Sequence, residues 1–222
     1  MGFLEKIFSH KKEKAETPEP EFSREEYVRY YEQKEQALEA VLGKMNDIVG
    51  HAIIPFDVGG AVDMYYFQNH IEGVGFATME LLDPNGNGPK PNMLGTYELV
   101  AFTKQRYNYA KETQTPFNLM ERRICGIFTT IGNYSFQAVL NPGETCEIPG
   151  GDKDESRYLI FDNYKPEGGV FKIDKKSHHL LLCMEIFKSE MEFAIENGGN
   201  ELFEKLKQAG YYPYSDLNRE AI

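Results

Sequence analysis

The sequence predicts an α+β fold in which a mixed, largely antiparallel sheet packs with helices. Four segments place apolar residues at helical spacing, and the short apolar runs between them have the length of strands. Hairpins and helices connect these strands in no regular βαβ alternation, which disfavours a doubly wound parallel sheet. With 222 residues, 41% of them hydrophobic, the chain can build a sizeable core.

Residues 1–22 are predicted to form a flexible N-terminal segment, and residues 23–222 a single domain. The stretch 9–22 is rich in Lys, Glu and Pro, a composition typical of a solvated linker. Residues 1–8, MGFLEKIF, are mildly amphipathic, so they are either a frayed end or a small docking helix. Beyond residue 22 the sequence shows no internal repeat and no further boundary.

Each of the four expected helices has a start or stop signal. Ser23 and Glu26 fit a capping box, which satisfies free N–H groups at a helix start, and helical periodicity continues from there to Gly50. The other three helices are expected over 117–134, from a second capping box of Ser189 and Glu192 to Gly198, and from Asn200 to Gly210.

Five strands are expected, over residues 61–67, 74–82, 95–103, 158–162 and 179–187. The connection 83–93 contains Asn-Gly and several prolines, which indicates a long β-connection of the kind that can act as a flap. Residues 141–156 are acidic and rich in turn formers, so we expect a loop there.

The formal net charge of −11 excludes some classes of partner. Nucleic-acid binding needs clustered Lys and Arg, so we expect no nucleic-acid partner. The acidity either attracts a basic protein partner through electrostatic steering or only confers solubility. No apolar run approaches the roughly 18 residues of a membrane helix, and Cys125, Cys146 and Cys183 do not suggest a disulfide framework. We therefore expect a cytoplasmic protein with no membrane contact.

Familiar catalytic and metal-binding motifs are missing from the sequence. There is no G-x-S-x-G, H-E-x-x-H, C-x-x-C or phosphate-binding loop. His178 and His179 are adjacent, so in a strand they point to opposite faces and cannot hold one metal ion together. We expect no metal and no cofactor, and we assign no catalytic residue.

The sharpest pattern is a single carboxylate within each of several apolar strands. The acids are Asp63 in AVDMYYF, Glu80 in FATMELL, Glu98 in TYELVAF and Glu185 in LLLCMEIF. Because alternate strand residues share a face, each strand has a wholly apolar face and a second face that carries the acid. Neighbouring strands in register would join these second faces into one hydrophobic groove. The candidate binding residues are Asp63, Tyr65, Glu80, Glu98 and Glu185.

Three interpretations of these acids remain open. Each carboxylate can lie at a margin of the sheet, paired with Arg or Lys. The acids can line a groove that binds an apolar segment with a basic or His group. Finally, two neighbouring carboxylates with different pKa values can serve a metal or general acid–base site.

The C-terminal tail, GYYPYSDLNREAI, combines three tyrosines with Pro213. Large aromatic side chains gain by burial, so we expect an ordered, non-helical segment docked on the domain. Tyr211, Tyr212 and Tyr214 would pack, and Asp216 would pair locally with Arg219.

Six segments within about residues 45–222 form a recognisable series: VDMYYF, GFATMEL, LGTYELVAFTK, YLIFDNY, HHLLLCMEIFKSEMEFA and LKQAGYYPYSDLNR. This series resembles the bacterial Suppressor of fused (SUFU) domain family. The resemblance implies a SUFU-like single domain. It also implies kinship with eukaryotic proteins that are not enzymes and that hold a transcription factor of Hedgehog signalling by β-augmentation. Some bacterial members have been proposed as immunity proteins against polymorphic toxins.

This chain departs from the eukaryotic pattern, because it carries one domain and no Trp. The resemblance therefore transfers neither a two-domain clamp nor any individual peptide-binding residue. The preferred hypothesis is a non-enzymatic protein- or peptide-binding domain, with an immunity role as its finer form. The alternative is a hydrolase or metal-dependent enzyme that uses Asp63, Glu80, Glu98 or Glu185.

Overall fold

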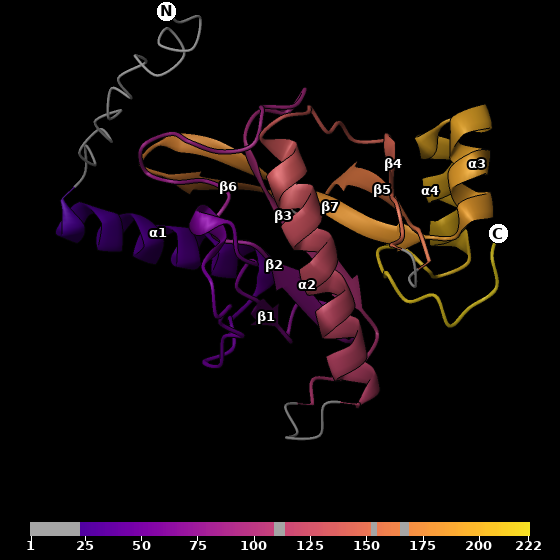
Figure 1. Ribbon diagram of the computed structural model, residues 1–222, viewed down its shortest axis with the longest axis horizontal. Helices are drawn as coiled ribbons and strands as arrows, with labels where there is room; N and C mark the ends of the chain where they lie inside the picture. The colour runs from indigo at the N-terminus through magenta and orange to yellow at the C-terminus, as the bar shows by residue number, and fades with distance from the viewer. Residues whose placement is uncertain (1–22, 109–113, 152–154, 165–168) are drawn as a thin grey trace, which may run out of the picture.

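A seven-stranded sheet with helices on both faces forms the centre of the computed structural model (Figure 1). The structure describes residues 23–108, 114–151, 155–164 and 169–222. The proposed N-terminal segment, residues 1–22, lies outside this range. The predicted α+β class, with a mixed and largely antiparallel sheet, is confirmed. No helix in the described ranges is long and apolar enough to cross a membrane.

The strand order is β1-β2-β3-β7-β5-β4, and β6 forms a hairpin with the beginning of β7. Only β3 and β7 pair in parallel among the described strands. The strands are β1 (Tyr65–Phe67), β2 (Val74–Ala77), β3 (Tyr97–Thr103), β4 (Thr145–Ile148), β5 (Arg157–Asn163), β6 (Val170–Ile173) and β7 (Lys176–Ile186).

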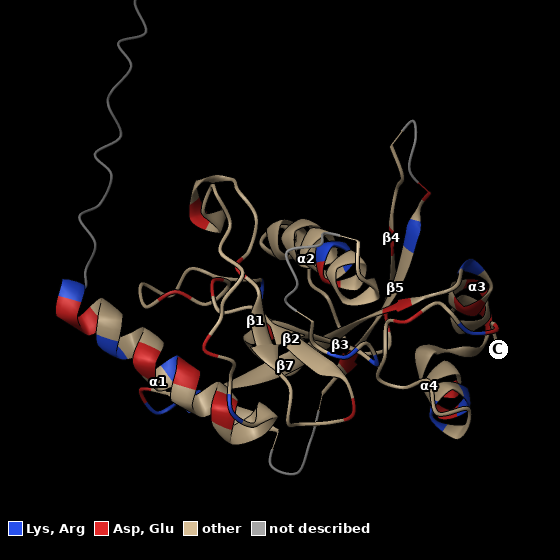
Figure 2. Ribbon diagram, turned by 90° about the horizontal axis from the view of Figure 1, so that it is seen from below, with Lys and Arg blue, Asp and Glu red and all other residues tan. Residues whose placement is uncertain are grey.

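Each face of the sheet contributes to a separate apolar core. Leu180 and Leu182 of β7 belong to the core shared with α1 (Arg24–Leu42) and α4 (Gly199–Gln208). Leu181 and Cys183 belong to the core beneath α2 (Pro116–Ser135). Figure 2 shows α1 and α2 on opposite sides of the sheet. The alternation predicted for β7 therefore holds, and it separates the two cores.

The first helix begins as expected and ends earlier than expected. The Ser23 Oγ accepts from the Glu26 N–H at 3.3 Å, and the Glu26 carboxylate accepts from the Ser23 N–H at 2.9 Å. Gly43, at φ +79°, then ends α1 well before Gly50. The chain continues in extended form along β1, where the Asn46 N–H donates to the Tyr66 carbonyl at 2.8 Å. This pairing covers the outer edge of the sheet.

The start signals expected for the last two helices are wrong. In α3 (Lys188–Asn197) the N-cap is Phe187, whose N–H donates to the Glu190 carboxylate at 3.0 Å, so Ser189 and Glu192 form no box. The α4 helix follows directly after Gly198, at φ +96°, and is not capped by Asn200.

The predicted strands also differ from the observed ones. The strand expected over 74–82 ends at Ala77, because the backbone after it turns to bond the Glu98 side chain. Two strands were not predicted: β4, which lies in the acidic loop, and β6. The β6–β7 hairpin turns through Asp174 and Lys175, both at positive φ, which is a turn without the usual glycine signal.

The tail is docked, as expected, but its polar contacts differ from the predicted ones. Asp216 does not pair with Arg219; it accepts at 2.8 Å from the Thr103 hydroxyl and from the Lys104 N–H at the end of β3. Arg219 instead donates to the buried Glu190 of α3, with Nη2 2.8 Å from Oε2. The tail therefore connects β3 to α3.

We predict that Arg219→Ala lowers the free energy of unfolding by about 3–5 kcal/mol, because it leaves the Glu190 carboxylate buried without its cation. Urea denaturation measures this change. The matched control is Lys44→Ala, which breaks an exposed ion pair with Asp47 and should cost less than about 1 kcal/mol. Equal losses in the two variants would contradict the structural role of the tail.

Candidate functional site

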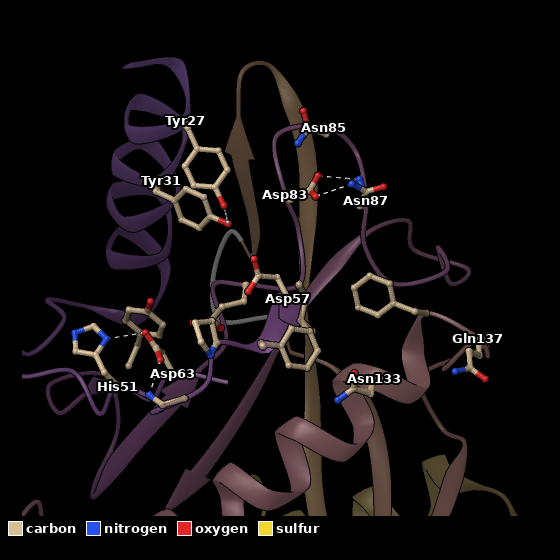
Figure 3. A pocket seen from close by; sticks show the side chains of 17 residues that line it. Tyr27, Tyr31, His51, Asp57, Asp63, Asp83, Asn85, Asn87, Asn133 and Gln137 are labelled. Carbon is tan, nitrogen blue, oxygen red and sulfur yellow. Dashed lines mark hydrogen bonds and ion pairs between the residues drawn. The ribbon is translucent and has the colours of Figure 1, made fainter. Parts of the chain in front are cut away.

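A cleft of about 940 Å³ opens between α1, the loop before β1, the turn after β2 and the end of α2 (Figure 3). The α1 wall carries Tyr27 and Tyr31, whose hydroxyls lie 3.3 Å apart. The α2 end contributes Asn133, Phe136 and Gln137. Four segments that are distant in the sequence thus build one concave surface.

The cleft is acidic. Its described lining includes four carboxylates, Asp57, Asp63, Glu80 and Asp83, and neither Lys nor Arg. His51 is the basic side chain of this lining, and its Nδ1 lies 2.7 Å from Asp63 Oδ2 (Figure 3). Asp83 is held by the backbone and side-chain N–H groups of Asn87, at 2.9 and 2.7 Å. This arrangement favours a cationic occupant.

Aromatic and aliphatic side chains surround these acids. Phe56, at the base of the loop 51–58, packs against Phe136 with 6.2 Å between the ring centroids. The same loop exposes three aliphatic side chains, Ile53, Ile54 and Val58. We refer to these three residues as the apolar rim. They do not line the cleft, but they alternate along the loop with residues that do, such as Ala52 and Asp57. Exposed aliphatic residues of this kind are available to a binding partner.

A buried ion pair lies beneath the cleft. Lys34 of α1 and Glu98 of β3 have fully buried side chains, and Lys34 Nζ lies 2.8 Å from Glu98 Oε1. Lys34 also donates to the Met79 carbonyl at 2.8 Å and to the Leu82 carbonyl.

The Glu98 carboxylate completes this network from the other side. It accepts from the Thr78 hydroxyl at 2.7 Å and from the Leu82 N–H at 3.0 Å. Both charges are thus hydrogen-bonded several times, which is the condition for stable burial of an ion pair. The network holds residues 78–82 as a tight turn below the cleft.

Glu80 projects from this turn into the lining of the cleft. Its Oε2 accepts from the Met79 N–H at 3.1 Å, while its Oε1 is buried and has no hydrogen-bond partner among the described residues. Burial, and then the negative charge of Glu98, raise the pKa of Glu80 to about 7. Burial, followed by the charge of Glu80, also raises the pKa of the Tyr65 hydroxyl.

The structure separates the five candidate residues. Asp63, Tyr65 and Glu80 line the cleft, whereas Glu98 lies below it in the ion pair with Lys34. Glu185 lies on the opposite face of the sheet, where Arg123 of α2 donates to it with Nη2 2.6 Å from Oε1. The single groove expected from the strand pattern is therefore wrong for Glu98 and Glu185.

Strand register explains this division. In the parallel pair, Glu98 of β3 lies beside Leu180 of β7, so it shares the α1 face with Leu180. Glu185 is an odd number of residues from Leu180 and points to the α2 face. For both acids, the interpretation of pairing with Lys or Arg describes the observed contacts.

Several lining and supporting residues could not be identified from the sequence. Asp57 and Asp83 lie in connections, where an acid carries no periodic signal. The sequence does contain a signal for Lys34, because it lies between Tyr30 and Leu38 at the i, i+4 spacing of the buried face of α1. A lysine at a core position requires a buried acid, but nothing local identifies Glu98. Within the described ranges, no three His, Cys, Asp or Glu side chains are placed to hold a metal ion.

This chain is similar to one protein family and to solved structures with the same fold. A family model described as Suppressor of fused protein (SUFU) matches residues 61–220. The solved structure titled "the Sufu-Fu complex crystal structure" superposes with a TM-score of 0.56 at 16% identity, over 87% of this chain and 90% of that chain. The solved structure of Drosophila Suppressor of Fused gives a TM-score of 0.54 at 16% identity, over 81% of this chain.

These likenesses confirm the predicted SUFU-like fold. The chain spans about half of the Drosophila protein, since the match covers 47% of that chain. No curated protein sequence matches this chain.

We predict that Glu80 makes stability depend on pH. Its pKa rises from 4.5 to about 7 on folding, so between these values the folded state holds a proton that the unfolded state has released. Stability from this group is complete below pH 4.5 and falls as the pH rises toward 7. The melting temperature of Glu80→Gln minus that of the wild type should therefore increase from pH 5 to pH 8.

The matched control for this measurement is Glu147→Gln, on the exposed side of β4. Its difference from the wild type should stay constant over the same range. A Glu80→Gln difference that is also constant would show that the Glu80 carboxyl has no raised pKa.

Proposed function

Because the chain belongs to the Suppressor of fused (SUFU) family, we propose that it is a non-enzymatic domain that binds a segment of a basic protein in the acidic cleft. The observation that carries this proposal is the lining of the cleft, with four carboxylates and neither Lys nor Arg among its described residues. A basic segment would gain from these charges at short range. The net charge of −11 would steer it at longer range.

The solved relatives support a binding role. The structure whose title names a Sufu-Fu complex matches this chain over nearly its whole length. At 16% identity this likeness concerns the fold, so the partner is inferred from the chemistry of the present cleft. An extended segment fits the site, because the loop that supplies part of the cleft lining also carries the apolar rim.

Within this proposal the candidate residues have different roles. Asp63, Tyr65 and Glu80 contact the partner, since they line the cleft. Glu98 and Glu185 are structural, because each is committed to an ion pair. Two of the four acids considered for an enzyme are thus neutralised on different faces of the sheet, which favours the non-enzymatic hypothesis over the enzyme.

The finer form of the proposal is an immunity role in the cytoplasm, in which the partner is a basic polymorphic toxin. An acidic inhibitor that recognises a basic toxin gains association rate from opposite net charges. A toxin gene beside the gene for this chain would support this form. Co-expression of the two proteins should then protect the producing cell.

Affinity capture from cells that produce the protein tests the binding proposal. We expect a specific basic protein to be recovered with the wild-type chain and with Glu196→Lys, an exposed change on α3. Asp57→Lys, an exposed change of equal charge in the cleft lining, should reduce recovery at least tenfold through like-charge repulsion. Equal recovery by both variants, or no specific protein in any capture, would contradict the proposal.

A further inference from the structure

Glu80 is a carboxylate of the cleft that has a buried oxygen and no paired cation among the described residues. Asp63 has His51 at 2.7 Å and also accepts from the Ala52 N–H at 2.8 Å. Glu98 has Lys34, and Lys34 uses its remaining donors on two carbonyls. Glu80 is bonded by the Met79 N–H and by the Tyr65 hydroxyl, both neutral donors, and its buried Oε1 lacks a partner among the described residues. A buried acceptor without a donor is costly and indicates that a ligand can supply one.

The surroundings of Glu80 define the chemistry of that ligand. Tyr65 and Tyr31 both line the cleft. After burial, the negative charge of Glu80 contributes to the raised pKa of each tyrosine hydroxyl. Aromatic rings attract a cation through their faces, and a carboxylate adds a charge-assisted hydrogen bond. Lys34, which lies beneath the cleft, already combines a carboxylate partner with a cation–π contact: its Nζ lies 5.0 Å from the centroid of the Tyr31 ring. A second cation that enters the cleft from solvent would meet the Glu80 carboxylate and the Tyr31 and Tyr65 side chains.

The rim of the cleft adds a second requirement. Ile53 is fully exposed, and Ile54 and Val58 expose more than half of their surface. These side chains would be buried by apolar neighbours of the cationic residue. A free amine or a metal ion would leave the apolar rim uncovered, so a protein segment is the better occupant.

We propose that the cleft takes one lysine or arginine side chain of a protein partner, with its cationic end against the Glu80 carboxylate and the flanking apolar residues on the rim. This inference rests on the proposed function and specifies the partner's anchor residue. Lysine offers three donors and arginine five, enough for Glu80 Oε1 and the Tyr31 and Tyr65 hydroxyls.

Selection from a phage-displayed library of random dodecapeptides tests this inference. The library is applied to the full chain as wild type, as Glu80→Gln and as Glu147→Gln, an exposed control with the same charge change. We expect the wild type and the control to select peptides with Lys or Arg at one position beside apolar residues. This enrichment should be lost with Glu80→Gln, which keeps the shape of the side chain and removes the charge.

A synthetic peptide from the selection gives the magnitude. Its affinity should fall at least tenfold with Glu80→Gln, and equally when its lysine is acetylated or its arginine is replaced by citrulline. Selected peptides that lack Lys and Arg, and that bind the wild type but not Asp57→Lys, would overturn the inference. The proposed function would then still stand if the capture experiment recovers a basic protein with the wild type and loses it with Asp57→Lys. A selection without any cleft-dependent peptide would also overturn it, and the capture experiment would then decide the proposed function alone.

Discussion

The buried ion pair of Lys34 and Glu98 determines the shape of the region that we assign to binding. Taking both charges out of water is costly, and only several good hydrogen bonds on each ion can offset that cost. The two side chains make these bonds to the hydroxyl of Thr78 and to the backbone of Met79, Leu81 and Leu82. One interaction thus connects α1, β3 and the turn after β2.

This turn is why the cleft exists. If the backbone continued as a strand beyond Ala77, Glu80 would be one more residue on a sheet face. Because Glu98 draws the Leu81 and Leu82 N–H groups inward, β2 stops and Glu80 reaches the cleft lining. Lys34 neutralises Glu98 and leaves Glu80 without a cation. The fold thereby presents a carboxylate that an external positive charge can pair with.

The features that could be predicted from the sequence are those set by residues close together in the chain. The capping box of Ser23 and the alternation along β7 depend on neighbouring residues, and the structure contains both. The aromatic composition of the tail predicted that it docks, but its contacts with β3 and α3 could not be predicted. The partners of Glu98 and Glu185 could not be predicted, because Lys34 and Arg123 lie more than 60 residues away in the chain. Glu80 and Glu98 have similar sequence surroundings, and only the tertiary contact with Lys34 distinguishes them.

Hydrogen exchange at the Leu81 and Leu82 amides tests the central claim, that this ion pair fixes the floor of the cleft. In the wild type, we expect both amides to be as well protected from exchange as the Phe161 amide of β5. In Lys34→Met they should exchange at least 100-fold faster relative to Phe161, because Glu98 loses its cation and the turn opens. Unchanged relative protection of Leu81 and Leu82 in that variant would show that the Lys34–Glu98 ion pair does not hold this turn in place.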